Sequence, residues 1–348
     1  MRRKVAVLGA GAWGTALAKL LADKGDDVVL WSRRSDLCEA INAAGENARY
    51  LPGARLPPNL RAAHDLGAAL DGAGLVVFVV PSHATREVAR AAAPYVQGLP
   101  AEVAVVSATK GIENDSLTFM DEVLGEELPA AARGRLAFLS GPSFAKELAR
   151  GLPTAVVIAS RDADVGADVM RRFHTPFMRT YASDDVPGVE CGGALKNVIA
   201  IAAGAIDGMG FGHNTRAMLI TRGLAEVAKL AMARGGSALT VAGLAGMGDL
   251  VLTCTGELSR NRTVGFEMGK GRTLGEVLAS LGHVAEGVKT AKSAHDLAVK
   301  LGVEMPITRE VHAVLYEDKP VHAAVRDLMA RELGYEFDPR AIARATLQ

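Results

Sequence analysis

Three glycines near the start of the chain have the spacing of a phosphate-binding loop. Gly9, Gly11 and Gly14 follow a short apolar run, VAVLG, and open a segment with helical periodicity. In such a loop the first glycine permits a tight turn, the second lets backbone approach a pyrophosphate, and the third allows close helix packing. The N–H groups at the start of the helix attract phosphate. The pattern predicts a dinucleotide site, with a glycine turn that binds nothing as the alternative.

The end of the second apolar run, VVLWS, indicates which dinucleotide is bound. A site specific for NAD usually has an acidic residue here, which binds the 2′-hydroxyl of the ribose. This chain has Ser32 followed by Arg33 and Arg34, and arginines at this point can bind a 2′-phosphate. The sequence therefore favours NADP(H) as the cofactor and leaves NAD(H) possible. Two solvated surface arginines are the alternative.

A lysine and an asparagine, Lys196 and Asn197, lie within a segment of Gly, Ala, Ile and Met that is typical of a buried helix. A lysine is almost never fully buried unless another group pairs with it. Asp249, which follows the glycine turn AGMG, is a candidate for the carboxylate that keeps Lys196 charged. The alternatives are that Asp249 only caps a helix and that Lys196 extends its ammonium to water along an apolar stem.

A possible anion site follows Asp249 in the sequence. Ser259, Arg260 and Asn261 precede a probable helix. A hydroxyl, a guanidinium, an amide and the N–H groups of a helix N-terminus can together bind an anion such as phosphate. The alternative is that Ser259 caps the helix while Arg260 is solvated.

Three further polar loops follow predicted strands: residues 80–84, 107–113 and 140–147. Ligands of open α/β sheets bind beyond the carboxyl ends of the strands. Lys110 follows its strand directly, so its ammonium either points into such a cleft or remains in solvent. A helix begins near Gly141, Ser143 and Ala145, and Ser143 either caps it or binds a ligand.

Short β-branched runs alternate with helical patterns over about the first 185 residues. The runs are mostly continuous, as expected for parallel strands that are covered on both faces. They span residues 5–9, 28–32, 75–80, 102–108, 136–141 and 154–160. This alternation predicts an α/β fold whose N-terminal part is a doubly wound, Rossmann-like sheet.

The strand signal stops near Pro187, and Ala-, Leu- and Val-rich segments at helical spacing follow. They span residues 187–207, 214–234, 273–281, 287–301 and 306–316. We therefore expect two domains: a dinucleotide-binding domain over residues 1–187 and an all-helical substrate and catalytic domain over residues 188–348.

The composition excludes several classes of protein. The 348 residues include 39 Lys and Arg against 39 Asp and Glu, without a basic block, so we expect no nucleic-acid partner. Cys38, Cys191 and Cys254 are too few and too far apart for a disulfide framework or a zinc site. The eight histidines have no ligand spacing, so no metal is expected. No run approaches the roughly 18 apolar residues of a transmembrane segment, and we expect a soluble, cytoplasmic protein.

Together these segments resemble one family, the bacterial-type NAD(P)-dependent glycerol-3-phosphate dehydrogenases. The matching segments occur in the expected order between about residues 4 and 316: GAGAWGTALA, WSRR, VPSHATREV, SATKGIE, LSGPSFAKE, VECGGALKNVIAIAAGAIDG, GMGDLVLTC, SRNRTVG and VAEGVKTA. The resemblance implies reversible hydride transfer between NAD(P)H and dihydroxyacetone phosphate. The product would be sn-glycerol 3-phosphate for phospholipid synthesis.

The resemblance also implies a role for each candidate residue. Lys196 takes the place of the catalytic lysine; an ammonium there protonates the oxygen of the ketone during reduction and, once neutral, accepts the proton during oxidation. The implied substrate residues are Lys110, Gly141, Ser143, Asn197, Asp249, Ser259, Arg260 and Asn261. The implied cofactor residues are Gly9, Gly11, Ala12, Trp13, Gly14, Arg33, Arg34, Lys110, Ala145, Arg260, Val284 and Glu286. Relatives often have a hydroxyl residue in place of Ala12, so a phosphate contact there must come from backbone.

Two other functions stay open at this point. One is a reductase of similar architecture that acts on a β-hydroxyacid or on ketopantoate, although neither substrate has the phosphate that Arg260 and Lys110 would bind. The other is a non-catalytic protein that senses NADP. A homodimer is possible.

Overall fold

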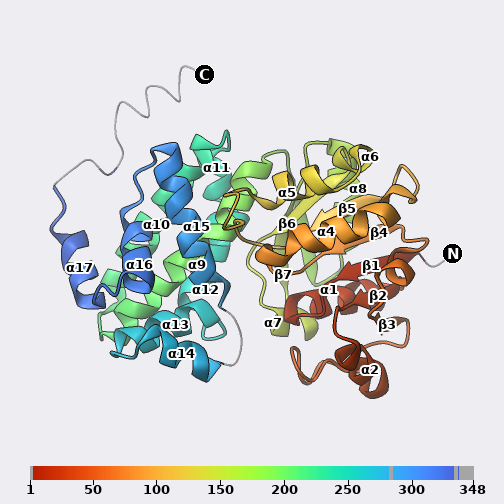
Figure 1. The fold of residues 1–348 in the computed structure, drawn as a ribbon, viewed down its shortest axis with the longest axis horizontal. Coiled ribbons are helices and arrows are strands. Elements are labelled where there is room, and N and C mark those ends of the chain that lie inside the picture. Colours follow the sequence, from red (N-terminus) through yellow and green to blue (C-terminus); the bar gives the residue numbers. More distant parts are fainter. Residues whose placement is uncertain (1–2, 282–284, 333–335, 337–348) are drawn as a thin grey trace.

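The computed structural model describes residues 3–281, 285–332 and 336. These residues form two domains, an α/β domain from the N-terminal half of the chain and a helical domain from the rest (Figure 1). The predicted fold class is thereby confirmed.

One sheet with the strand order β3-β2-β1-β4-β5-β6-β7-β8 forms the centre of the first domain. The strands are β1 (Lys4–Leu8), β2 (Asp27–Trp31), β3 (Leu60–Ala63), β4 (Leu75–Phe78), β5 (Ala104–Ser107), β6 (Leu136–Ser140), β7 (Thr154–Ala159) and β8 (Met178–Ser183). The strands β1 to β6 run parallel, β7 is antiparallel to β6, and β8 is parallel to β7. The strand order reverses direction between β1 and β4, and at such a point the strand ends leave a crevice for a ligand.

Helices pack against the sheet from both sides. They are α1 (Ala12–Asp23), α2 (Ser35–Ala44), α3 (Leu66–Leu70), α4 (Ser82–Gln97), α5 (Met120–Glu127), α6 (Ala130–Arg133), α7 (Ala145–Ala149) and α8 (Ala163–Phe173). Along β1, Val5 and Val7 belong to one hydrophobic core, while Ala6 and Leu8 belong to another. Because side chains alternate across a strand, both faces need apolar residues, which explains the continuous apolar runs.

The six predicted strands are present, and two strands were not predicted. The edge strand β3 has only four residues, LRAA, and an exposed arginine. In β8, MRTYAS, exposed polar residues alternate with buried ones. Both lack the continuous apolar run that identified the other strands. The antiparallel direction of β7 was also not predicted, because a run of apolar residues carries no direction.

The second domain is helical. Its elements are α9 (Val186–Gly208), α10 (His213–Ala233), α11 (Ala238–Val241), a π-helical turn η1 (Leu244–Gly248), α12 (Asp249–Thr255), α13 (Arg260–Gly269), α14 (Leu274–Leu281), α15 (Glu286–Leu301), α16 (Pro306–Tyr316) and α17 (Val321–Met329). The five predicted long helices match α9, α10, α14, α15 and α16 within two residues at each end. The predicted division after residue 187 falls in the first turn of α9 and stays a prediction.

Helix α9 is the central element of this domain, and its contact with α13 depends on glycine. Gly204 and Gly208 on α9 face Gly265 and Gly269 on α13. A Cβ atom at Gly204 would lie 1.9 Å from the carbonyl oxygen of Arg262, and one at Gly265 would lie 1.8 Å from that of Ile201. The two helices therefore touch backbone to backbone.

Two stretches among the described residues are long and apolar enough to cross a membrane by length and composition alone. One is α9, of which 83% of the apolar window is buried inside the protein, so α9 is the core helix of its domain. The other, Ala238–Thr255, combines α11, η1 and α12, and 39% of it is buried.

We predict that Gly265→Ala lowers the free energy of unfolding by at least about 1–3 kcal/mol, the usual cost of overpacking. The added methyl group meets a backbone carbonyl, which cannot move aside as a flexible side chain would. Urea unfolding followed by circular dichroism measures the change.

Gly125→Ala in α5 is the matched control, because a Cβ atom there has no neighbour within 4 Å. That change should stabilise the protein by about 0.5–1 kcal/mol, since alanine favours a helix over glycine. Equal stability of Gly265→Ala and the wild type would contradict the close helix contact.

Candidate active site

The glycine loop between β1 and α1 has the geometry that a dinucleotide requires. Gly9 has φ +126°, and a Cβ atom there would lie 2.6 Å from the carbonyl oxygen of Val79. A Cβ atom at Gly14 would lie 1.9 Å from the carbonyl oxygen of Gly9. At Gly11, which caps α1, nothing lies within 4 Å of such an atom. The first and third glycines are thus required by the fold, while the second leaves open space at the start of the helix, as pyrophosphate binding needs.

The first turn of α1 offers one additional donor. Ala12 begins the helix and has no polar side chain. The indole Nε1 of Trp13 is buried and has no hydrogen-bond partner within the described parts of the chain. A buried N–H without a partner is costly, so Trp13 is a reasonable candidate for a ligand contact.

Arg33 and Arg34, in the loop after β2, differ in whether they have an anionic partner. Arg34 forms a two-pronged ion pair with Asp36, which lowers the pKa of Asp36 to about 2. Arg33 is exposed. The buried hydroxyl of Ser32 accepts a hydrogen bond from the backbone N–H of Arg34, 3.2 Å away. Arg33 is therefore the better placed of the two to reach a ligand, because Arg34 already has an anionic partner.

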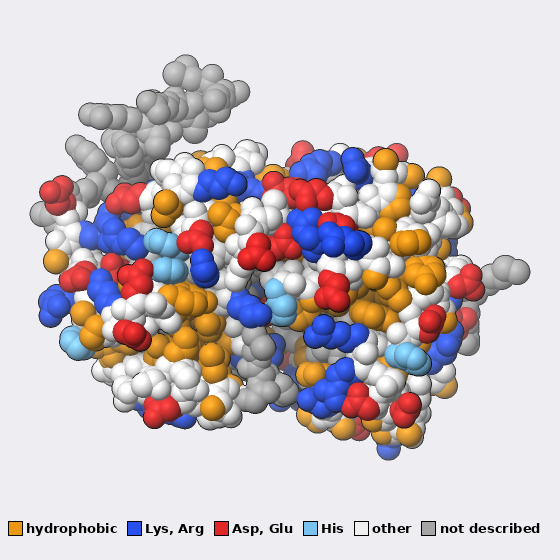
Figure 2. Space-filling view, in the orientation of Figure 1, with side chains coloured by type: hydrophobic (Ala, Val, Ile, Leu, Met, Phe, Trp, Pro, Cys, Tyr) orange, Lys and Arg blue, Asp and Glu red, His pale blue; other side chains and the backbone are white. Residues whose placement is uncertain are grey.

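Two lysines share one carboxylate where the domains meet. Lys196 Nζ lies 2.5 Å from Asp249 Oδ1, and Lys110 Nζ lies 2.5 Å from Asp249 Oδ2. Asp249 is fully buried, and the lysine side chains are 12% and 14% exposed. Figure 2 shows that the surface is hollowed between the two domains and that basic side chains border the hollow. The ion pair between Lys196 and Asp249 that the sequence suggested is present.

The environment makes Lys196 a better proton donor than an ordinary lysine. Burial lowers its pKa to about 8; the charge of Asp249 opposes that shift and the charge of Lys110 adds to it. Such an ammonium keeps its proton at neutral pH and releases it more readily than a solvated lysine. An acid with a pKa near the working pH is well suited to general acid–base catalysis.

The segment before Asp249 is shaped by glycines. Asp249 follows the π-helical turn η1, a rare conformation that occurs often at functional sites. A Cβ atom at Gly246 would lie 1.9 Å from the carbonyl oxygen of Val241, and one at Gly192 on α9 would lie 2.5 Å from that of Ala245. Close backbone packing between η1 and α9 thus brings Asp249 to Lys196.

Lys110 crosses from the sheet to the helical domain. It follows β5, and its Nζ donates a hydrogen bond of 3.2 Å to the carbonyl oxygen of Gly141. The hydroxyl of Ser143 donates to the same oxygen over 3.0 Å. Gly141 has φ +140°, where other residues are strained, and its Cβ position would be 3.0 Å from Val156 Cα. The loop after β6 therefore positions Lys110, while Ser143 bonds within its own loop. Ala145 begins the short helix α7 beyond it.

The starts of α13 and α15 meet α9 beside the lysines. Asn261 Oδ1 accepts a hydrogen bond of 2.9 Å from the backbone N–H of Gly287. A Cβ atom at Gly287 would lie 2.8 Å from the carbonyl oxygen of Asn197. The Asn197 side chain is buried, and in the described structure it makes no hydrogen bond. Asn261 thus joins α13 to α15, and the amide of Asn197 remains available to a ligand.

Ser259 and Arg260 have different environments. The Ser259 hydroxyl accepts a hydrogen bond from the backbone N–H of Arg262, 3.2 Å away, and so caps α13, as the alternative interpretation expected. Arg260, the first residue of α13, is exposed, and its guanidinium bonds to no described side chain.

Burial raises the pKa of Glu286, and Arg260 with the two lysines opposes that rise. Glu286 therefore faces the same cations. Val284 lies outside the described residues.

Sequence reasoning missed two residues around the lysines. Thr253 lies one helical turn after Asp249 and donates a hydrogen bond of 2.6 Å to its carbonyl oxygen. The i, i+4 spacing on a helix could have revealed it. Gly193 on α9 leaves room for the hydroxyl of Ser140 beside the Lys110 stem, since a Cβ atom there would lie 2.7 Å from Ser140 Oγ. No local pattern points to that contact.

One group of potential metal ligands exists among the described residues. His295, Asp296 and His312 bring their ligand atoms within 4.8 Å of one another. The histidines come from α15 and α16, so spacing in the sequence could not reveal them. Their rings stack with centroids 4.2 Å apart, and Asp296 pairs with Lys292.

A glycine loop on a Rossmann-like sheet and a buried lysine pair at a domain junction define a two-domain, dinucleotide-dependent oxidoreductase. The models of the N-terminus and the C-terminus of NAD-dependent glycerol-3-phosphate dehydrogenase match residues 4–166 and 185–326. The chain belongs to this family.

Individual relatives agree. The glycerol-3-phosphate dehydrogenase (NAD(P)+) of Geobacter metallireducens is 54% identical to this chain, and the match covers 95% of this chain and 98% of that protein. The enzyme of the same name from Myxococcus xanthus is also 54% identical, and the match covers 94% of this chain and 96% of that protein. The crystal structure of glycerol-3-phosphate dehydrogenase from Coxiella burnetii has a TM-score of 0.89 and 42% identity, covering 95% of this chain and 99% of that one. A ketopantoate reductase from Ralstonia eutropha shares the fold alone, with a TM-score of 0.56, 20% identity, and coverage of 92% of this chain and 99% of its own.

We predict that Asp249→Asn lowers the free energy of unfolding by about 3–5 kcal/mol, because it leaves two largely buried ammonium groups without their counter-ion. Lys196→Met should cost far less, since Asp249 keeps Lys110 as a partner. Thermal and urea unfolding at neutral pH measure both changes.

The double variant, Lys196→Met with Asp249→Asn, is the informative control. It should be more stable than Asp249→Asn alone, because one of the two unpaired charges is gone. Strict additivity of the two single changes would contradict the shared ion pair.

Proposed function

We propose that this protein catalyses reversible hydride transfer between NAD(P)H and dihydroxyacetone phosphate, giving sn-glycerol 3-phosphate for phospholipid synthesis. The observation that carries the proposal is the Lys196–Asp249–Lys110 cluster beyond the carboxyl end of β5. Its chemistry fits reduction of a ketone, because the oxygen that gains negative charge needs a proton and a nearby cation. The two bacterial relatives are named glycerol-3-phosphate dehydrogenase (NAD(P)+), which supports the proposal.

Lys196 acts as the general acid in this proposal. The bound nicotinamide supplies or accepts the hydride. During reduction, Lys196 Nζ gives its proton to the substrate oxygen, and during oxidation the neutral amine takes the proton back. The pKa of about 8 supports both directions near neutral pH. Asp249 orients the ammonium, and Lys110 supplies the second positive charge near the developing alkoxide.

The phosphate of the substrate binds at the start of α13. Arg260 supplies a guanidinium that no described side chain engages, and the N-terminus of α13 adds backbone N–H groups that Ser259 does not cap. Asn197 binds a substrate hydroxyl or carbonyl through its amide. Ser259 and Asn261 complete the substrate site and also hold the starts of α13 and α15 in place. Gly141 and Ser143 support Lys110.

The cofactor lies along the glycine loop, with its pyrophosphate over Gly11 and its adenosine ribose beside Ser32. Arg33 binds the 2′-phosphate, and Arg34 reaches it by exchanging its partner Asp36. NADPH is therefore used at least as well as NADH. Trp13, Ala145, Val284 and Glu286 complete the cofactor site. The enzyme acts in the cytoplasm.

The substrate phosphate provides the test of function. The wild type should oxidise NADPH with dihydroxyacetone phosphate and act poorly on dihydroxyacetone. Arg260→Ala should raise KM for the phosphorylated substrate, because a hydrogen bond to a charged group contributes about 1.5–3 kcal/mol, or about 10- to 150-fold. Absorbance at the nicotinamide band follows both reactions.

Turnover of dihydroxyacetone should hardly respond to Arg260→Ala. An unchanged KM for dihydroxyacetone phosphate in the variant would place the phosphate elsewhere. Absence of any turnover by the wild type, despite tight NADPH binding, would instead favour a sensor of NADP.

The cofactor preference depends on Arg33. Arg33→Asp should weaken NADPH binding much more than NADH binding, because the new carboxylate repels the 2′-phosphate and can accept a hydrogen bond from a 2′-hydroxyl. Fluorescence titration with each cofactor measures the two dissociation constants. Equal losses for both cofactors would show that Arg33 does not contact the 2′-phosphate.

A further inference from the structure

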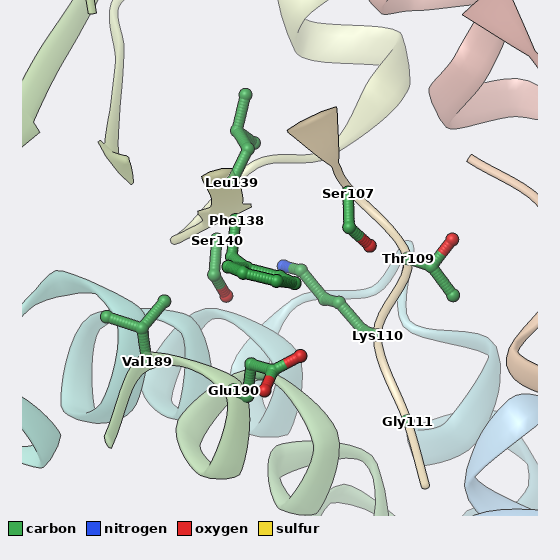
Figure 3. A pocket seen from close by; sticks show the side chains of 10 residues that line it. Ser107, Thr109, Lys110, Gly111, Phe138, Leu139, Ser140, Val189 and Glu190 are labelled. Atoms are coloured by element: carbon green, nitrogen blue, oxygen red, sulfur yellow. The ribbon is translucent and has the colours of Figure 1, made fainter. Parts of the chain in front are cut away.

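A small cavity lies beside Lys110 (Figure 3). It is lined by residues at the ends of β5 and β6 and in the first turns of α9, among them Ser107, Ser140, Glu190 and Gly193. Its volume is about 10 Å³, which is close to the minimum that one water molecule needs.

Two hydroxyl groups in the wall of this cavity have no protein partner. Ser107 and Ser140 are 1% and 4% exposed, and within the described structure neither Oγ forms a hydrogen bond. Ser107 is in register with Phe138, and Ser140 lies two residues beyond Phe138, so both serines face the same side of the sheet. A buried hydroxyl without a partner costs about 1–3 kcal/mol, and two neighbouring ones point to a shared ligand.

The ammonium of Lys110 has a hydrogen that the protein does not use. Lysine has three N–H donors, and the described partners of Lys110 Nζ are two, Asp249 Oδ2 and the carbonyl oxygen of Gly141. Figure 3 shows the amine end of Lys110 directed between Ser107 and Ser140. Gly193 leaves room for the Ser140 hydroxyl, because a Cβ atom there would lie 2.7 Å from Ser140 Oγ, whereas the Lys110 stem would be at an ordinary contact distance of 3.5 Å.

Glu190 adds a carboxyl group to the same wall. Its Oε1 accepts a hydrogen bond of 3.1 Å from the backbone N–H of Asp121, whereas its Oε2 is buried without a partner among the described residues. Burial, and then the charge of Asp121, raise the pKa of Glu190 well above its ordinary value. This shift favours the neutral form of Glu190, which has no charge to draw Lys110 away from Asp249. Asp121 keeps its own counter-ion, since its Oδ2 lies 2.6 Å from Arg161.

We propose that this cavity binds one water molecule, which accepts the third N–H of Lys110 and donates to the hydroxyl oxygens of Ser107 and Ser140. Three hydrogen bonds are the usual number for a buried water. The water fixes the Lys110 ammonium against Asp249, so Ser107 and Ser140 are positioning residues for the substrate site. The functional part of this inference rests on the proposed function, whereas the water site itself does not.

The proposal gives a specific expectation for Lys196. The charge of Lys110 lowers the pKa of Lys196. If Lys110 loses the water and moves away, the pKa of Lys196 rises. The pH at which the reduction rate begins to fall then rises with it. Substrate binding also weakens, because the second cation is less well placed.

The first test is a high-resolution crystal structure of the wild type without substrate. It should contain electron density for a water within hydrogen-bonding distance of Lys110 Nζ and both serine Oγ atoms. A dry cavity, with the serines bonded to backbone, would overturn the proposal. This result does not depend on which reaction the enzyme catalyses.

The second test is kinetic and uses Ser107→Ala combined with Ser140→Ala. KM for dihydroxyacetone phosphate should rise about tenfold, the lower end for one hydrogen bond to a charged group, while KM for NADPH stays unchanged. The alkaline fall in the reduction rate should move to higher pH. Unchanged substrate KM and an unchanged pH profile would overturn the positioning role.

Ser160→Ala is the matched control. Ser160 is equally buried, but its hydroxyl donates to the carbonyl oxygen of Leu136 over 2.9 Å and does not line the cavity. Its loss should lower stability without changing KM or the pH profile. If the wild type fails to reduce dihydroxyacetone phosphate at all, the proposed function fails, and the electron density still decides the water site.

Discussion

The carboxylate of Asp249 is the group on which the rest of the site depends. It is fully buried, and each of its oxygens lies 2.5 Å from a lysine ammonium. An isolated carboxylate or ammonium in such a place would be neutralised, since burying one unpaired charge costs several kcal/mol. The cluster carries a net positive charge and can therefore hold an anionic oxygen. The charge of Asp249 helps Lys196 to keep its proton. Burial lowers the pKa of Lys196, so the proton is released more readily than from a solvated lysine.

Both domains are needed to assemble this cluster. Lys110 comes from the end of β5 in the sheet, Lys196 from the buried face of α9, and Asp249 from the turn after η1. Glycines fix the parts of the helical domain that carry the site. Gly192 lets η1, and with it Asp249, approach α9, which carries Lys196. The contact of Gly204 with α13 places that helix, with Arg260 at its start, beside α9. Stability and function therefore share one element, because α9 is both the core of its domain and the carrier of Lys196.

The sequence alone was sufficient for features that arise from local patterns. The glycine loop, six continuous strands and five long helices each leave a periodic or positional signature in neighbouring residues. The strands β3 and β8 do not, since they are short or polar on one side. The sharing of Asp249 by Lys110 could not be predicted either, because those residues lie 139 positions apart and meet only through domain packing. The bond from Gly287 to Asn261 and the cavity beside Lys110 also join residues that are distant in the sequence. The pairing of Arg34 with Asp36 is local, but the sequence does not show which partner a surface arginine has.

The pH dependence of kcat/KM in both directions tests the central claim most directly, because it reports the pKa of the free enzyme. Reduction needs Lys196 charged, and oxidation needs it neutral. With a pKa of about 8 for Lys196, the rate of dihydroxyacetone phosphate reduction should fall tenfold per pH unit above that value. The rate of glycerol 3-phosphate oxidation should rise tenfold per unit up to it and then level off. Mirror-image profiles that bend near pH 8 are the predicted result. Profiles without a bend between pH 7 and 9, or bends near the ordinary lysine value of 10.5, would contradict a desolvated Lys196 as the acid.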